Sequence, residues 1–276
     1  SRTRPSVKHL AMVWKEASEM ANEKKPYYTD DELIARMWAK ETVKDLMARH
    51  AHYYSSDLRR QELCDLWVTM PMYRRTASLA NNFGYYVGMD EISNYYVVQH
   101  TQRRYEQLAA YADVPKDNLH LGHGVMSHHT SNTPLCYIAE DGKTAKYLAY
   151  DCGEQTVGKP DGTMDAYFVF GLIFADLVCE NGVWKIWHLA LLHDHTIPVG
   201  VDYGEAVPIE IQPGDDPLEA EFGEPTVKRT VYEPFFGWEY MYQDMPRPYY
   251  SYTDIRSYGP EGELGLPYYE RERMEI

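Results

Sequence analysis

One strand-forming stretch carries side chains that are suited to acid–base chemistry. Alternate positions along it hold Trp184, Ile186, His188, Ala190, Leu192 and Asp194. Successive side chains of a strand point to opposite faces, so these six are expected to share one mostly apolar face. A neutral imidazole at His188 could act there as a general acid or base near pH 7. The alternative is a histidine that bonds one backbone carbonyl and does no chemistry. Asp194 is predicted to be a carboxylate at the mouth of a pocket.

Other histidines gather at two places in the chain. His193 and His195 lie at the end of the same stretch without a third ligand nearby, so we predict a polar strand end and no metal site. An earlier segment holds His120, His123, His128 and His129. His123 lies between two glycines, which permit close approach of another group, and it is predicted to contact the substrate. The cluster could instead face a subunit interface.

A helical segment contributes a tyrosine, a carboxylate and a cation. A pocket-facing pair of Tyr54 and Asp57 could hold a phenol or an alcohol, and a buried tyrosine can donate a proton to a leaving hydroxyl. Arg59 is the nearest cation and could stabilise a phenolate through its forked donors. The alternatives are tyrosine rings that only pack and an arginine in solvent.

Two further segments complete the predicted site. Tyr85 is expected to stack on an aromatic ring or relay a proton, and Asn82 and Tyr150 are expected to contact the substrate. The predicted catalytic residues are therefore His188, Tyr54, Tyr85 and Asp57, and the predicted binding residues are Arg59, Asn82, His123, Tyr150 and Asp194. The chain has no Gly-x-Ser-x-Gly elbow and no phosphate-binding or dinucleotide glycine motif.

The elements that position these residues follow from hydrophobic spacing. Helical periodicity runs over 31–68, with an interruption expected near 54–57, and returns over 90–112. From about residue 119 the chain is rich in strand-forming residues, and Asn181-Gly182 between two long apolar runs predicts a hairpin. Helices followed by antiparallel strands indicate an α+β fold, with N-terminal helices packed across a curved antiparallel sheet.

Three regions are expected along the chain. Residues 1–30 form an N-terminal helical extension and residues 31–200 form the α+β domain. Residues 201–276 are rich in proline and tyrosine, and they are too aromatic for a solvated linker. We predict an extended C-terminal arm that packs on its own domain or on a neighbouring subunit.

Composition narrows the function classes. The formal net charge of −15 argues against nucleic acid and anionic membranes as partners. The chain has no apolar run of about 18 residues and no secretory signal, so a cytoplasmic location is expected. Its four scattered cysteines are predicted to be buried free thiols. The 25 tyrosines, against 7 phenylalanines, suit a small aromatic, partly polar substrate or subunit contacts. A homo-oligomer, dimer or trimer, is predicted.

Three segments resemble SnoaL-like proteins of the nuclear transport factor 2-like superfamily. They are 81–88 (NNFGYYVG), 141–146 (DGKTAK) and 180–188 (ENGVWKIWH). The resemblance implies a cone made by a curved sheet with helices across its mouth. It also implies acid, base and hydrogen-bonding groups in an apolar cavity, without a metal or organic cofactor.

The C-terminal region resembles the extension of one bacterial subgroup. The matching segments are 246–250 (PRPYY) and 257–260 (SYGP). That subgroup includes the cofactor-independent diarylpropane lyase of lignin-dimer breakdown. The resemblance implies a lyase that dehydrates a phenolic diaryl diol through a quinone methide and releases formaldehyde. The alternatives on the same fold are a polyketide cyclase or isomerase, a dehydratase, and a non-catalytic binding or assembly module.

Overall fold

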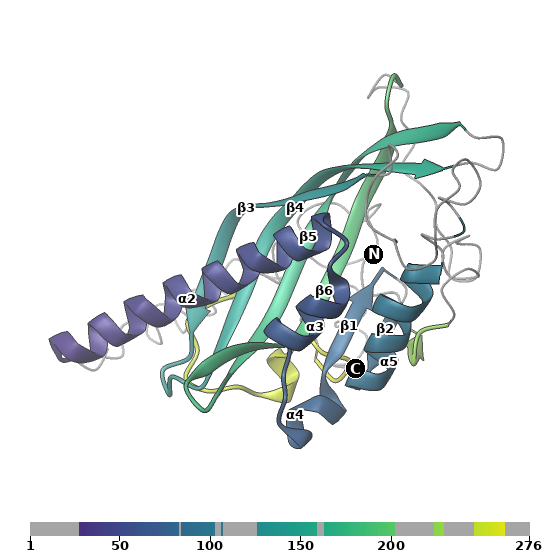
Figure 1. Cartoon of the computed structure of the whole chain (residues 1–276). Helices are drawn as coiled ribbons and strands as arrows, with labels where there is room; N and C mark the ends of the chain where they lie inside the picture. The colour runs from purple at the N-terminus through teal and green to yellow at the C-terminus, as the bar shows by residue number, and fades with distance from the viewer. Residues whose placement is uncertain are drawn as a thin grey trace, which may run out of the picture. The chain divides into compact units, whose positions relative to one another are not determined.

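The computed structural model describes residues 28–82, 84–102, 106, 126–158, 163–201, 224–228 and 246–262 (Figure 1). Residues 1–27 of the predicted extension 1–30 lie outside these residues, as do His123 and much of the predicted arm. The chain divides into two compact units, Ser1–Trp38 and Ala39–Ile276. Among the described helices, none combines the length and the apolar composition that spanning a membrane requires.

The first long helix begins at a capping box. In the unit Ser1–Trp38, Thr29 N donates to Glu32 Oε2 at 2.7 Å, and Glu32 N donates to Thr29 Oγ1 at 3.3 Å. This reciprocal pair satisfies two backbone donors that a helix start leaves unpaired. The helix expected from residue 31 therefore begins directly after the cap Thr29, and helix α2 runs over Asp30–Ser55.

The helical half of the unit Ala39–Ile276 is interrupted as predicted. Asp57 adopts a φ of +56°, a conformation that aspartate tolerates better than most residues and that ends α2. The next helices are α3 (Arg59–Leu66), α4 (Pro71–Thr76) and α5 (Met89–Ser93), and α5 continues into a π-helix, η1 (Asn94–Gln99).

Seven strands of the described residues form one curved, unclosed sheet. They are β1 (Ser78–Asn81), β2 (Gly84–Val87), β3 (Ser127–Ile138), β4 (Thr144–Gly158), β5 (Met164–Glu180), β6 (Val183–Pro198) and β7 (Val227–Lys228). Their order is β3-β4-β5-β6-β1-β2-β7, and each neighbouring pair is antiparallel except β1 with β6. The predicted α+β class and curved antiparallel sheet are confirmed. The strands β1 and β2, which lie between the two helical parts of the chain, form an antiparallel two-stranded hairpin.

The central hairpin β5–β6 has the predicted turn and two irregularities. Asn181 and Gly182 adopt φ values of +51° and +84°, as a type I′ turn requires. The register between β5 and β6 then shifts at Asp176/Leu177 and at Phe170/Gly171. Each shift leaves one residue of β6 without a partner on β5. Trp187 is the extra residue at the first shift, and Asp194 is the extra residue at the second. A bulge of this kind changes which side chains share a face.

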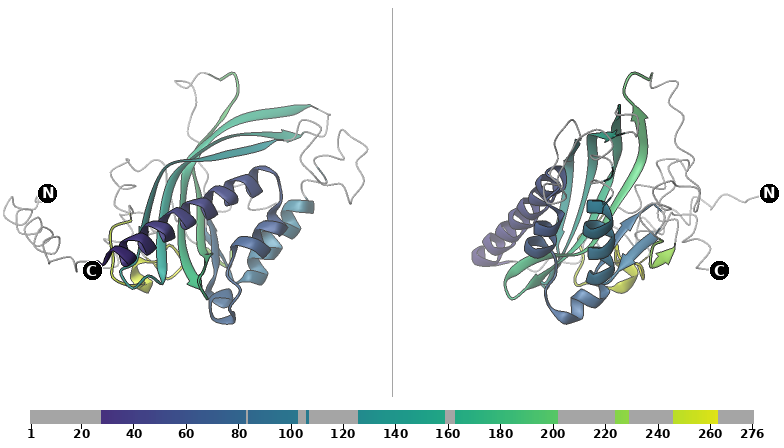
Figure 2. Two further views of the ribbon diagram at one scale, coloured as in Figure 1. Left: turned by 60° about the vertical axis from the view of Figure 1, so that its left-hand side comes forward. Right: turned by 45° about the vertical axis from the view of Figure 1, so that its right-hand side comes forward.

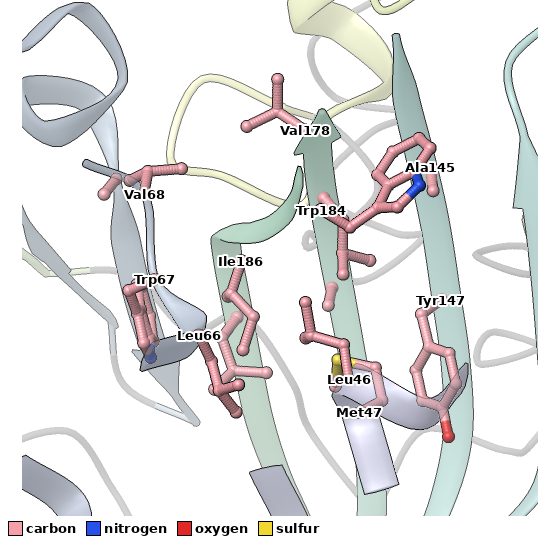
Figure 3. Packing of buried hydrophobic residues seen from close by; sticks show 14 of the residues in the cluster. Leu46, Met47, Leu66, Trp67, Val68, Ala145, Tyr147, Val178, Trp184 and Ile186 are labelled. Carbon is pink, nitrogen blue, oxygen red and sulfur yellow. The ribbon is translucent and has the colours of Figure 1, made fainter. Parts of the chain in front are cut away.

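The sheet has two different faces. The helix face carries Tyr147, Ile173 and Leu189, which pack in one core with Leu46 and Met47 of α2. Figure 3 shows these two α2 residues among side chains of α3, β4, β5 and β6. The outer face carries a second, smaller core built on Leu148, Leu172, Phe174, Ala190 and Leu192.

Residues 246–262, which we call the C-terminal strap, pack on the outer face and at the β3–β4 turn. Glu140 N and Asp141 N donate to the carbonyls of Tyr249 and Tyr250, each at 3.0 Å. Tyr258 is fully buried against Phe174, with ring centroids 5.1 Å apart. Figure 2 shows this yellow segment and the helices α3 and α5 on different sides of the sheet.

The four cysteines are all free thiols, as predicted. Cys136 is buried, whereas Cys64 is exposed on α3, so the prediction of four buried thiols is wrong for Cys64. The predicted homo-oligomer stays a prediction.

Candidate active site

A histidine–carboxylate pair lies on the helix face. His129 of β3 and Asp151 of β4 are both nearly fully buried, and His129 Nδ1 lies 2.9 Å from Asp151 Oδ2. Burial alone would raise the pKa of Asp151, but the hydrogen bond and charge of His129 lower it below its usual value. An ionised Asp151 favours the tautomer with the proton on Nδ1. His129 Nε2 is buried and has no hydrogen-bond partner among the described residues.

The end of α2 holds this histidine in place. Ser55 Oγ accepts from His129 N at 3.0 Å and donates to His129 O at 3.4 Å. The ring of Tyr54 meets the His129 imidazole edge to face, with centroids 4.7 Å apart. Because the helix ends at Ser55, the last residues of α2 lie against β3 beside the His129–Asp151 pair, which we call the dyad.

A buried cation lies beside Tyr54. The Arg59 guanidinium carbon is 4.3 Å from the Tyr54 ring centroid and 4.6 Å from that of Tyr96, and Arg59 Nε donates to Asp57 Oδ1 at 3.2 Å. Although burial disfavours its charge, Tyr54, Tyr96 and Asp57 raise the pKa of Arg59. Arg59 therefore supplies a permanent positive charge.

A second histidine faces the dyad across a glycine. Gly171 of β5 pairs with Asp151 on one side and with His193 on the other, so the three residues form one row on the helix face. A Cβ at Gly171 would lie 2.1 Å from the carbonyl oxygen of Leu192, so only glycine permits this close approach. Burial, helped by His129 and opposed by Asp151, lowers the pKa of His193 to about 4. The imidazole of His193 is thus neutral at pH 7.

Asn82 fixes the backbone of β6 at this point. Its Nδ2 donates to His193 O and its Oδ1 accepts from His193 N, both at 2.8 Å. The side-chain amide of Asn82, a predicted binding residue, therefore bonds the backbone of His193 directly before the second bulge of β6. These two bonds continue the pairing of β1 with β6.

His188 lies on the outer face. It shares that face with Ala190 but not with Ile186, because the bulge at Trp187 breaks the predicted alternation. Its Nδ1 hydrogen-bonds Ser78 Oγ at 2.8 Å, and a Cβ at Gly259 of the strap would lie 2.7 Å from its ring. Burial, opposed by Asp176 and helped by Lys146, lowers the pKa of His188 to about 4. The structure thus places His188 and Tyr54 on opposite faces of the sheet.

Tyr85, Tyr150 and Asp194 have three different surroundings. Tyr85 is fully buried in the outer core, and Tyr150 of β4 is 39% exposed. Asp194 lies at the second bulge of β6, and burial raises its pKa to about 6. The structure therefore brings together Tyr54, Asp57 and Arg59 but not His188 or Tyr85. Four residues of this site, His129, Asp151, His193 and Tyr96, are outside the predicted catalytic and binding sets, although the sequence places His129 and His193 in its two groups of histidines.

Acidification is expected to destabilise the fold. Both His188 and His193 have folded pKa values of about 4 against an unfolded 6.5, so the unfolded chain binds their protons first. Stability then falls as pH drops from about 6.5 to about 4, by up to about 1.4 kcal/mol per pH unit for each histidine. Asp194, with its raised pKa, gains stability on acidification below about pH 6 and offsets part of this loss. Urea unfolding between pH 7 and pH 4.5 measures the slope.

The control for this pH dependence is His188→Gln, which cannot titrate. Its slope below pH 6.5 should be shallower than that of the wild type by up to about 1.4 kcal/mol per pH unit. An unchanged slope would show that His188 is not held neutral by burial.

The fold and this site define an α+β protein with a buried polar site between its helices and a bent sheet. Residues 35–190 match the family described as the SnoaL-like domain. The chain belongs to this family, as the sequence resemblance predicts. Comparison with curated proteins gave no match.

Several solved structures are similar at low identity. The hexachlorocyclohexane dehydrochlorinase LinA-type3 from Novosphingobium barchaimii LL02 is 11% identical, with a TM-score of 0.44 over 62% of this chain and 97% of that chain. A putative scytalone dehydratase from Novosphingobium aromaticivorans DSM 12444 is 13% identical, with a TM-score of 0.42 over 65% of this chain and 99% of that one. A protein of unknown function from Mycobacterium tuberculosis is 14% identical, with a TM-score of 0.38 over 68% of this chain and 88% of that one.

Proposed function

We propose that this chain is a cofactor-independent lyase that uses the His129–Asp151 dyad as its general base. The observation that carries this proposal is the buried Nε2 of His129, which has no partner among the described residues while Nδ1 is held by an ionised carboxylate. An imidazole in that state has a lone pair directed away from its carboxylate, and burial keeps bulk water from occupying it.

The neighbouring groups suit an elimination. His129 Nε2 takes a proton from the substrate, and Asp151 stabilises the imidazolium that forms. The Tyr54 hydroxyl donates a proton to the leaving hydroxyl, which departs as water. The Arg59 cation, flanked by two tyrosine rings, stabilises the negative charge that develops on the substrate.

The proposed substrate is a phenolic diaryl diol of the lignin type. The phenol reacts as its phenolate after its proton has passed to solvent. The benzylic hydroxyl takes the proton of Tyr54 and leaves as water, which gives a quinone methide and a deprotonated Tyr54. His129 then removes the proton of the neighbouring primary alcohol, the carbon–carbon bond breaks, and formaldehyde leaves, after which the proton held by His129 returns to Tyr54. The bonding electrons rearomatise the ring to give a stilbene phenolate, which Arg59 would pair. The support is the resemblance of the C-terminal region together with the cation beside the dyad.

Product analysis tests this reaction. A diaryl diol incubated with the protein should give a stilbene and formaldehyde in equal amounts, measured by absorbance and by a formaldehyde assay. A rearranged product without formaldehyde would instead indicate an isomerase or cyclase. Binding without any turnover of the diols tried would indicate a binding module. Either outcome would overturn the proposed lyase.

The same assay separates the two faces of the sheet. His188 and Tyr85 were predicted as catalytic from the sequence, and they lie together on the outer face. If His188→Gln loses turnover while His129→Gln keeps it, the acid–base site is on the outer face and the proposal for the dyad is wrong.

A further inference from the structure

We infer that Glu62 is a positioning residue that fixes the Arg59 guanidinium through Tyr96. The inference rests on the proposed function in that Arg59 belongs to the site, and it assigns a role to a carboxylate that the elimination does not use. Glu62 of α3 is fully buried, and its carboxylate accepts three hydrogen bonds.

The three donors come from three different segments. Glu62 Oε1 accepts from His50 Nδ1 at 2.9 Å and from Trp67 Nε1 at 3.1 Å. Glu62 Oε2 accepts from the hydroxyl of Tyr96 at 2.8 Å. One carboxylate thereby joins α2, α3, the residue after α3 and η1.

Glu62 stays charged in spite of its burial. Burial would raise its pKa, but the charge and hydrogen bond of His50, with the bonds of Trp67 and Tyr96, lower it. The same burial and the charge of Glu62 raise the pKa of Tyr96 well above its usual value, so its hydroxyl remains a donor. A buried ion is costly to maintain, and apolar side chains would join these helices at lower cost. A role limited to holding these helices together therefore does not explain why the Glu62 carboxylate is charged.

Tyr96 links this carboxylate to the site. It lies in the π-helical turn η1, and such turns occur often at functional sites. Its ring is 4.6 Å from the Arg59 guanidinium carbon and 6.3 Å from the Tyr54 ring. Because Glu62 holds the hydroxyl end of Tyr96, it fixes one of the two rings between which Arg59 lies.

Glu180 provides a matched control. Its carboxylate is also buried and also accepts three hydrogen bonds, from Thr69 N and Oγ1 and from Met70 N, at 2.7 to 2.9 Å. It lies at the β5–β6 turn. Among the described residues, its hydrogen bonds reach neither the dyad nor Arg59 and the residues around it, Tyr54, Asp57 and Tyr96. Glu180→Gln should therefore cost stability without loosening Arg59.

The test is the exchange of the Arg59 Nε proton with solvent, measured by NMR. This proton is protected by burial and by its bond to Asp57. Tyr96→Phe keeps the ring but removes the bond to Glu62, and Glu62→Gln removes the charge. Each should speed exchange of the Arg59 proton by about tenfold or more, whereas Glu180→Gln should leave it at the wild-type rate.

Each outcome decides the inference. An unchanged exchange rate of the Arg59 proton in Tyr96→Phe would overturn the inference, because the bond to Glu62 would then have no effect on Arg59. An increase in Glu180→Gln as large as that in Glu62→Gln would also overturn it, because the effect would then come from a general loss of stability. If Glu62→Gln does not fold, Tyr96→Phe alone decides. If Tyr96→Phe and Glu62→Gln exchange the Arg59 proton faster but keep full turnover, the positioning role of Glu62 is supported and the use of Arg59 in the proposed reaction is contradicted. A failure of the inference can thereby be distinguished from a failure of the proposed function.

Discussion

His129→Gln is expected to lower kcat/KM on a diaryl diol by about 10²–10⁴. The substitution removes the Nε2 lone pair that has no partner in the described structure, while a glutamine amide can still reach Asp151. Folding should be retained, because Ser55 bonds the backbone of residue 129 and not its side chain. Formaldehyde release under substrate-limiting conditions measures the effect.

The matched control is the neighbouring histidine. His128 lies on the same strand with its side chain exposed, so His128→Gln makes the same chemical change outside the site. It should keep kcat/KM within about twofold, as surface substitutions usually do little. Equal losses in the two variants would indicate that β3, and not the imidazole of His129, determines activity.

Lys146→Met is expected to lower the free energy of unfolding by about 3–5 kcal/mol, because it leaves a buried carboxylate without its cation. Lys146 and Asp176 pair on the outer face with 3% and 1% of their side chains exposed. Asp176 also accepts from Ser257 Oγ at 3.1 Å and from Tyr258 N at 2.6 Å, so it anchors the C-terminal strap. Urea unfolding at pH 7 measures the loss.

A surface pair is the control for this effect. Lys44 and Glu41 form an ion pair at 2.8 Å with 34% and 64% of their side chains exposed. Lys44→Met should change stability by less than about 1 kcal/mol. A comparable loss in both lysine variants would contradict the claim that burial of Asp176 makes the difference.

The sequence predicts the fold well where local signals are strong. The Asn181-Gly182 turn, the capping box at Thr29 and the break near Asp57 each depend on residues that are adjacent in the chain, so they can be read without the tertiary structure. The bulges of β6 cannot, because an extra residue is visible only when β6 is paired with β5. A period-two extrapolation past Trp187 therefore assigns His188 to the wrong neighbours.

The same reason explains which site residues were found. Tyr54, Asp57 and Arg59 lie within six residues of one another around the end of α2, so their proximity follows from the chain itself. The dyad depends on the register of β3 against β4, which shifts between Asn132 and Leu135. The sequence did contain one usable signal for Asp151. Because β4 pairs with β5 without a register shift, period-two alternation starting from Tyr147 correctly places Asp151 on the helix face.

The most direct test of the proposed site is a crystal structure of the protein with a bound phenolic diaryl ligand. We expect the ligand on the helix face, with an oxygen within about 3.2 Å of His129 Nε2, as a hydrogen bond requires, and with its phenol near Arg59. A ligand bound on the outer face beside His188, with the His129 imidazole uncontacted, would contradict the account.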